Sequence, residues 1–481
     1  MKKLNERYAE IVRARFEENV KSGNAAVEFM RNSTAIYRGE PVACLYLPKI
    51  FSRDAYEFLR EAARQICEIL DKVIARYLHD SNYRALFPFP RELEELILSE
   101  AGYSRLLPIA RLDIFFNEDD FSFQFCEFNA DGASAMNEDR EINNAIRVSD
   151  AFHEMCKEYD LQSFEFFDSW VREFAEIFSE YNAKKFPCET NAPRAENSDC
   201  SALSSESHAN ENCDAKKFPR VAIVDFMENA TPNEFLQFQK AFEKAGFEAV
   251  IAEIRDLKFS NGELQTPDGK KIDAVYRRAV TCDIMRNKAD IQPFLQAARE
   301  NAACIIGHFR TQIIHNKSVF KILRAPETFE FLTRNEQEFL LRHIPETFSL
   351  TREIISQKNI LKNKNEWIIK PEDLYGSRGV FAGVDHDDDA WEKAVNDCAD
   401  SNYLLQKFCT PYKTENLDFN GSARPNFIFY NNITGLFVYN GKFSGIYSRA
   451  GLTGTISTYK RGLTLASMLG VPSTSATRNQ K

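Results

Sequence analysis

Apolar residues near the N-terminus follow a helical spacing. Tyr8, Ile11 and Val12 recur at intervals that place them on one face of a helix. A longer helix is predicted from Arg53 to about His79, because Ser52 is a residue type that caps helix N-termini well. The first part of the chain is therefore predicted to be mainly helical, and it offers no cluster of catalytic residue types.

From Arg111 the spacing changes to the alternation of residues that is typical of strands, in the segment RLDIFFNEDDFSFQFCEFNADGASAMNED. Arg111 and Asp113 fall on one face of a first strand, and Glu127 and Asn129 on one face of a second. The two pairs face the same side only if the turn has an odd length, such as residues 118–120. A four-residue turn would send Asp113 and Glu127 to opposite faces.

Three phenylalanines lead into this second polar pair. Phe121, Phe123 and Phe125 lie on the predicted face that continues to Glu127 and Asn129. A carboxylate that continues a buried row requires a partner. Oxygens of Asp, Glu and Asn suit Mg²⁺ held together with phosphates, and a guanidinium suits anionic oxygens. The alternative is an edge hairpin whose polar ends are solvated.

From residue 220 the pattern becomes that of an α/β unit. Strands are predicted over residues 221–226, 247–254 and 272–276, with a helix that begins at Pro232 after the first of them. This order predicts a small Rossmann-like unit. No GxGxxG follows its first strand, so no dinucleotide site is predicted.

Two lysines and a glycine-bounded loop are candidates for phosphate binding. Lys317 is predicted in the first turn of a helix that begins near Asn316, where a cation does not complement the helix dipole. Lys370 ends an apolar strand, and the loop Gly376-Ser377-Arg378-Gly379 follows. Glycines allow a backbone to approach phosphates closely, and lysine supplies a point charge. A plain surface lysine is the alternative for Lys317.

Composition narrows the class of protein. The net charge of −10 argues against a nucleic-acid-binding surface, which needs a basic footprint. The 11 cysteines show no metal spacing and read as the reduced thiols of a cytoplasmic protein. No apolar stretch resembles a signal peptide or a membrane span. The polar segment 183–219 is predicted to be disordered.

The motif R-x-D followed by E-x-N-A-D resembles the metal-binding strands of the glutathionylspermidine synthase family, which are ATP-grasp ligases with a permuted strand order. The resemblance implies ATP and two Mg²⁺ ions as cofactors. It assigns the metal to Asp113, Glu127 and Asn129, and the transferring phosphoryl group to Arg111 and Arg449. It assigns the nucleotide to Lys317, Lys370, Gly376, Ser377, Arg378, Gly379, Gln406 and Lys407.

The resemblance also implies a mixed α+β fold. The expected parts are a helical N-terminal region (1–110), metal-binding strands with helices (111–182), a disordered insertion (183–219), a Rossmann-like pre-ATP-grasp unit (220–306), an ATP-grasp nucleotide-binding region (307–471) and a flexible tail (472–481). In the family, a V-Y-R-R strand end faces the active cleft, which here is Arg277 and Arg278. A pair of exposed arginines is the alternative.

The implied function is an ATP-dependent carboxylate–amine ligase that works through an acyl phosphate. Its partners would be a small-molecule or peptide carboxylate and an amine, with no nucleic acid and no membrane. The alternative is a non-catalytic nucleotide-binding homologue with a regulatory or scaffolding role. The identity of the acid and amine does not follow from the fold.

Overall fold

The computed structural model describes residues 1–185, 218–456 and 462–473 of the chain. The chain is a mixed helix-and-sheet protein, as predicted. Most of the segment predicted to be disordered, and most of the predicted tail, lie outside the described residues. Residues 183–185 are described, and they form the end of helix α8 (Phe167–Lys185) instead of belonging to the disordered insertion.

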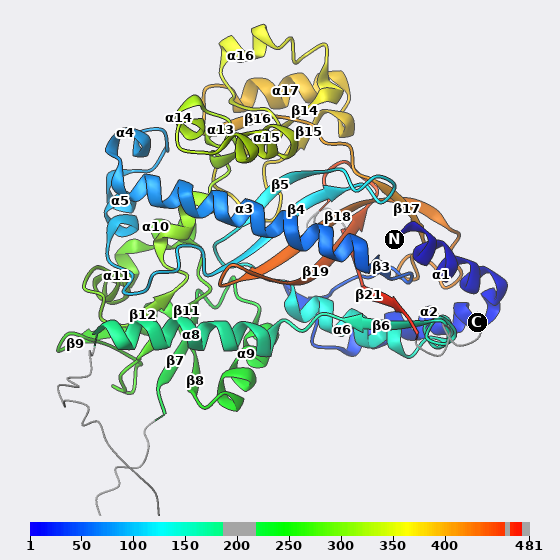
Figure 1. Cartoon of the computed structure of the whole chain (residues 1–481), viewed down its shortest axis with the longest axis horizontal. Helices are drawn as coiled ribbons and strands as arrows, with labels where there is room; N and C mark the ends of the chain where they lie inside the picture. The colour runs from blue at the N-terminus through cyan, green and yellow to red at the C-terminus, as the bar shows by residue number, and fades with distance from the viewer. Residues whose placement is uncertain (186–217, 457–461, 474–481) are drawn as a thin grey trace, which may run out of the picture.

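A six-stranded antiparallel sheet forms the centre of the molecule (Figure 1). Its strand order is β20-β19-β18-β4-β5, and β17 pairs with β18 outside this path. The strands are β4 (Ile109–Phe116), β5 (Phe123–Asn129), β17 (Lys413–Asn416), β18 (Ile428–Tyr439), β19 (Lys442–Gly451) and β20 (Leu463–Leu465). Strands from positions 109–129 and 413–465 thus meet in one sheet, and they bring Arg111 and Arg449 together.

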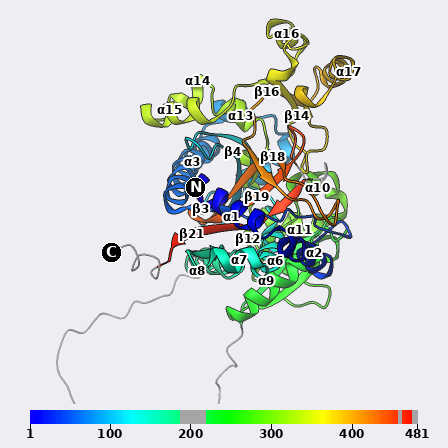
Figure 2. The same cartoon turned by 90° about the vertical axis from the view of Figure 1, so that its right-hand side faces the viewer.

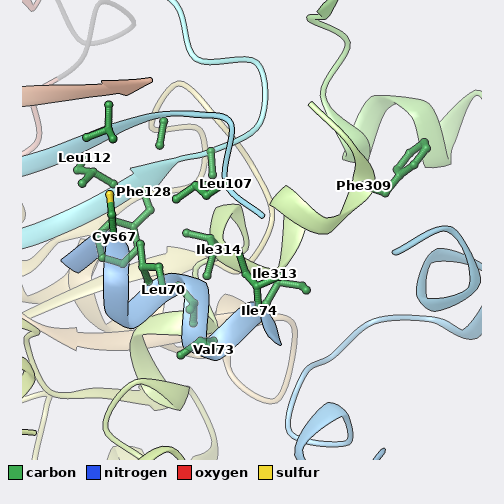
Figure 3. Packing of buried hydrophobic residues seen from close by; sticks show 14 of the residues in the cluster. Cys67, Leu70, Val73, Ile74, Leu107, Leu112, Phe128, Phe309, Ile313 and Ile314 are labelled. Atoms are coloured by element: carbon green, nitrogen blue, oxygen red, sulfur yellow. The ribbon is translucent and has the colours of Figure 1, made fainter. Parts of the chain in front are cut away.

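Helix α3 (Arg53–His79) crosses one face of this sheet (Figure 1). It begins and ends where the sequence predicts, and the Ser52 side chain accepts a hydrogen bond from the Ala55 amide. Figure 3 shows Leu70 and Ile74 of α3 among residues of the sheet and of the Ile313–Ile314 segment. Burying an aliphatic side chain of this size contributes about 1.5–3 kcal/mol. This helix therefore fixes the sheet against the later part of the chain.

The Rossmann-like unit is a parallel sheet of order β12-β11-β7-β8. Its strands are β7 (Arg220–Asp225), β8 (Glu248–Glu253), β11 (Ala274–Arg277) and β12 (Cys304–Ile306). Helix α9 (Pro232–Lys244) begins at the predicted proline and packs with α8 on this sheet. Because the strands are parallel, their carboxyl ends, Asp225 and Arg277 among them, lie at one edge.

A third sheet of order β13-β16-β14-β15 forms a lobe that stands above the central sheet in both views (Figures 1 and 2). Its strands are β13 (Thr347–Ser349), β14 (Trp367–Pro371), β15 (Phe381–Ala382) and β16 (Tyr403–Lys407). Helices α16 (Arg352–Gln357) and α17 (Asp388–Cys398) cover its outer side, and the buried Trp391 of α17 packs on it.

Three further strands join the two ends of the chain. Strand β21 (Ser467–Pro472) pairs with β3 (Lys49–Ser52) and with β6 (Tyr159–Ser163). The other strands are β1 (Ile36–Tyr37), β2 (Glu40–Pro41), β9 (Lys258–Ser260) and β10 (Glu263–Gln265). The remaining α-helices are α1 (Lys2–Ala14), α2 (Phe16–Asn32), α4 (Ser81–Arg84), α5 (Arg91–Leu98), α6 (Met136–Arg147), α7 (Asp150–Met155), α10 (Thr281–Arg286), α11 (Gln292–Arg299), α12 (Gln312–His315), α13 (Val319–Ile322), α14 (Pro326–Phe329) and α15 (Arg334–His343).

Some local expectations are wrong. The sequence pattern divides residues 426–439 into two strands around a polar turn at Asn431, but β18 is continuous there. The Asn431 and Asn432 side chains donate to the Thr453 and Tyr412 carbonyls, which lie just outside the neighbouring strands β19 and β17, so these polar residues are accommodated in a continuous strand. The sequence pattern also predicts one helix over residues 137–159 and another over 163–181. The first is divided into α6 and α7, which ends at Met155, and the second, α8, begins at Phe167 after β6. In the described part of the chain, no helix is long and apolar enough to cross a membrane.

Candidate functional site

A bulge in strand β5 decides which way the predicted metal ligands face. Strands β4 and β5 are joined by residues 117–122, a turn of even length, so the predicted odd turn is wrong. Phe125 pairs with Ile114, whereas Glu127 already pairs with Asp113, which leaves Cys126 as an extra residue. Such an insertion reverses the faces of all the residues beyond it. Glu127 and Asn129 therefore face Asp113 and Arg111 after all.

The bulge also separates the phenylalanines from the polar pair. Phe123 and Phe125 are buried with Phe128 in the core beneath α3. Glu127 and Asn129 lie on the opposite face and line a cavity. The predicted continuous row from phenylalanine to carboxylate is therefore wrong, although the predicted meeting of the four polar residues is confirmed.

Asp113 is the centre of a buried ion-pair network. Arg111 donates to both of its carboxylate oxygens, from Nε at 2.7 Å and from Nη2 at 3.0 Å. Arg449 of β19 donates to the same carboxylate at 2.9 Å, and Asn129 at 3.1 Å. Gly435 on β18 makes room, since a Cβ there would lie 2.8 Å from Cδ of Arg111. Asp113 is completely buried and orients both arginines.

Lys317 reaches Glu127 from the other side of the cavity. Its Nζ lies 3.0 Å from Glu127 Oε1 and donates to the Leu374 carbonyl at 2.6 Å. Burial alone would raise the pKa of Glu127, but the Lys317 and Lys370 ammonium groups lower it to about 2. Lys317 lies between α12 and α13, so its predicted place in a helix's first turn is wrong. The carboxylate stays ionised at neutral pH and holds Lys317 in the cavity.

Lys370 ends strand β14 as predicted and points into the same cavity. Its Nζ donates to the Cys126 carbonyl at 3.0 Å and to Gln406 Oε1 at 2.7 Å. Burial lowers the pKa of Lys370. Gln406 also donates to Thr347, so its side chain is fixed as a support for Lys370. Lys407, its neighbour on β16, points the other way and pairs with Glu366 at 2.5 Å.

The glycine-bounded loop lies beside these lysines. Gly376 and Ser377 line the cavity, and both have left-handed backbone conformations, with φ of 68° and 57°. The loop is tied down just before this point, because Lys317 donates its amide to the Glu372 carbonyl and its ammonium to Leu374. Arg378 stacks on Tyr375, with its guanidinium carbon 5.1 Å from the ring centroid. Gly379 packs against Tyr403, and neither it nor Arg378 is among the residues that line the cavity.

The cavity thus lies where the central sheet, the lobe and the edge of the parallel sheet meet. Four cationic side chains converge on two carboxylates at one end, and these six are Arg111, Arg449, Lys317, Lys370, Asp113 and Glu127. This excess of positive charge suits a polyphosphate. Of the predicted site residues, Arg378, Gly379 and Asp113 do not line the cavity, whereas Lys407 lines it but pairs its ammonium group with Glu366.

The sequence analysis missed several residues of the cavity. Tyr447 lies two residues before Arg449 on β19, and strand alternation could have indicated it. Glu138 and His315 also line the cavity, and the chain gave no signal for them because they come from separate helices. Arg277 is buried in an ion pair with Asp131 at 2.6 Å, and Arg278 pairs with Glu234 at 2.9 Å, so the alternative of two exposed arginines is wrong. Of the two, Arg278 lines the cavity, as expected for a strand end that faces the cleft, and Arg277 does not.

The oxygen atoms that line the cavity determine whether Mg²⁺ fits this site. Glu127 and Asn129 line the cavity with a carboxylate and an amide, the ligand types that Mg²⁺ prefers together with phosphate oxygens. The Asp113 oxygens are taken by arginines and Asn129. In the described part of the chain no group of three or more His, Cys, Asp or Glu side chains could hold a metal ion. The residues fit an ion whose coordination is completed by a substrate, and the metal role of Asp113 stays a prediction.

Asp225, at the carboxyl end of β7, lines the opposite side of the cavity. Burial raises its pKa to about 7, although Arg278 opposes this. The ordinary value of about 3.9 applies in the unfolded chain, so the folded state binds the proton more tightly and loses stability as pH rises from about 4 to about 7. We expect Asp225→Asn to raise the melting temperature relative to the natural protein at pH 8 and not at pH 4, measured by thermal unfolding.

The matched control for Asp225 is the exposed Asp290. Asp290→Asn should change the melting temperature equally little at both pH values. A stabilisation by Asp225→Asn that is the same at pH 4 and pH 8 would show that Asp225 ionises normally.

Comparisons with known proteins show the fold. No family model matches the chain, and no curated protein matches its sequence. Among solved structures, a glutathione synthetase-like effector from Globodera pallida in its apo form aligns with a TM-score of 0.56. The two chains share 11% sequence identity, and the alignment covers 94% of this chain and 96% of the other. The chain therefore has a glutathione synthetase-like fold.

A second solved structure is described as a putative gamma-glutamylcysteine synthetase from Methylobacillus flagellatus. It aligns with a TM-score of 0.40 and 9% identity, over 88% of this chain and 90% of that one. Neither of these two solved structures is described as a glutathionylspermidine synthase, the family that the sequence motifs resemble.

Proposed function

We propose that the chain is an ATP- and Mg²⁺-dependent carboxylate–amine ligase of the ATP-grasp type, related to glutathionylspermidine synthases. One observation carries the proposal: Arg111, Arg449, Lys317 and Lys370 come from four separate segments and converge on one cavity beside a glycine-bounded loop. Similarity in fold to a glutathione synthetase-like protein supports the same class.

Each cation has a part in this chemistry. Lys317 and Lys370 would neutralise the α- and β-phosphates of ATP. Arg111 and Arg449 would hold the phosphoryl group as it passes to the substrate carboxylate, and would then face the oxyanion that forms when the amine attacks. The products are an amide, ADP and phosphate. No nucleophile of the protein is required.

Glu127 and Asn129 would hold Mg²⁺ together with phosphate oxygens. When bound, the ion would neutralise part of the charge of the transferring phosphate. Lys317 would exchange its contact with Glu127 for a phosphate oxygen, since both need the same ammonium group.

A turnover assay tests the proposal. ADP release is measured with ATP and MgCl₂ in the presence of γ-glutamylcysteine or glutathione as the acid, and of glycine or spermidine as the amine. We expect one acid and one amine together to stimulate ADP release, with an amide found by mass spectrometry. ATP binding without any stimulated turnover would favour the second candidate, a non-catalytic nucleotide-binding homologue. One solved structure with a similar fold is described as an effector, and this description favours keeping the non-catalytic homologue as the second candidate.

A further inference from the structure

We propose that Glu138 is the general base of this ligase, which takes the proton that the amine substrate must lose before its nitrogen bonds to the activated carboxyl carbon. This inference rests on the proposed function and adds a catalytic residue to it. It also specifies the acceptor as an amine that arrives protonated.

Glu138 lies in the first turn of α6 and lines the cavity. The Tyr447 hydroxyl donates to its Oε2 at 2.6 Å. Among the described residues, Oε1 has no hydrogen-bond partner, and the carboxylate has no ion pair with lysine or arginine. One oxygen is therefore held in place while the other is free to accept a proton.

The Tyr447 ring connects Glu138 with the two arginines. The guanidinium carbons of Arg111 and Arg449 lie 5.6 Å and 5.7 Å from the centroid of this ring. An acyl group held by these arginines would be one aromatic ring away from Glu138. An amine that approaches such a group from the side of α6 would pass within reach of the free carboxylate oxygen.

The other carboxylates near this point are engaged. Glu234 of α9 pairs with Arg278 and accepts hydrogen bonds from the Ala135 and Asn137 amides. Asp139 accepts from Asn143 through Oδ2, and its buried Oδ1 has no partner among the described residues, but Asp139 does not line the cavity. Asp283 accepts from Tyr375 at 2.9 Å and pairs with Arg286. Glu138 is thus the carboxylate beside the two arginines that combines a fixed orientation with an open oxygen.

The charges around Glu138 support this role. Burial raises its pKa, Glu234 raises it further, and the hydrogen bond from Tyr447 and the two arginines oppose the rise. A carboxylate with a raised pKa is a stronger base.

The step is balanced in protons and electrons. The protonated amine first gives one proton to Glu138, which frees the electron pair of its nitrogen. The nitrogen then gives this pair to the carboxyl carbon of the acyl phosphate. The tetrahedral intermediate breaks its bond to the phosphate oxygen, and phosphate leaves with that electron pair and takes up the second proton that the nitrogen loses. Glu138 then gives its proton to water.

Hydroxylamine distinguishes the formation of the acyl phosphate from the deprotonation of the amine, the step that needs Glu138. It is unprotonated at neutral pH and traps an acyl phosphate as a hydroxamate without needing a base. With ATP, MgCl₂ and the acid that supports turnover, we expect Glu138→Gln to form hydroxamate within about threefold of the natural protein. The rate of amide formation with the amine at pH 7 should fall about 100-fold or more, and should recover as pH rises.

Two further variants sharpen the test. Glu154→Gln removes a carboxylate from α7 outside the cavity and should leave both rates unchanged. Tyr447→Phe keeps the ring but removes the hydroxyl, so the pKa of Glu138 rises and the acid limb of the rate profile should move to higher pH. An equal loss of hydroxamate and amide in Glu138→Gln, or no loss in either, would overturn the inference. Absence of hydroxamate with the natural protein for every acid would instead refute the proposed function itself.

Discussion

Lys370→Met should reduce ATP-dependent ADP release by about 100-fold or more while the protein stays folded. Lys370 is half-buried, and its ammonium group bonds only to the neutral Cys126 carbonyl and Gln406 amide among the described residues. Its charge is therefore available to phosphate, and one such contact in a water-poor site contributes about two to three powers of ten in rate. Burial disfavours the ammonium group of Lys370 while the nearby Glu127 carboxylate favours it, so we expect stability to change little. Steady-state turnover and thermal unfolding measure the two effects.

Lys407 offers a matched control from the neighbouring strand. Its ammonium group pairs with Glu366 and lies 5.1 Å from the Trp367 ring centroid, on the face of the sheet away from Gln406. Lys407→Met should retain turnover within about twofold, because exposed ion pairs contribute little. Equal losses in both variants would mean that Lys370 acts through the lobe's structure and not through phosphate.

Asp113→Asn should destabilise the protein as well as abolish turnover. The carboxylate is fully buried and neutralises Arg111 and Arg449, which are themselves largely buried. Removing one partner from a buried ion pair costs about 3–5 kcal/mol, since the remaining charges lose their counter-ion. We expect a corresponding fall in the free energy of unfolding, measured by urea denaturation at pH 7.

Glu127→Gln provides the contrast. Its side chain is 27% exposed, and its partner Lys317 also bonds to the Leu374 carbonyl. Turnover should be lost as in Asp113→Asn, but the free energy of unfolding should fall by less than in that variant, because Lys317 keeps its bond to the Leu374 carbonyl. If Asp113→Asn proves as stable as Glu127→Gln, the buried network does not hold the two arginines as its geometry indicates.

Strand alternation correctly predicted that Asp113 and Glu127 share a face, but the turn length from which it predicted this was wrong. Alternation placed Asp113 and Glu127 on the same face only with an odd turn, whereas the actual turn is even and the extra residue Cys126 restores the register. A bulge depends on packing on both faces of a sheet, and here Phe125 must reach the core while Glu127 must reach the cavity. No local pattern distinguishes that requirement from a simple hairpin.

Local sequence signals were sufficient to predict where an element begins or ends when residues close in the sequence determine that boundary. The cap at Ser52, the proline at α9 and the apolar run before Lys370 each led to an element that begins or ends where expected. The prediction of a turn at the asparagines of β18 was wrong, because the hydrogen bonds of these side chains form with segments that are distant in the sequence and exist only once the sheet has formed.

By itself, the sequence determined the mixed α/β class, the order of the main elements and the residue types that could bind a metal–nucleotide complex. It did so because caps, apolar periodicity and strand ends act over a few residues. Only the tertiary structure decided that Asp113 lies behind the arginines and that Tyr447 connects Glu138 to Arg111 and Arg449. These relations join segments more than 300 residues apart, and their geometry follows from how the sheets pack around one cavity.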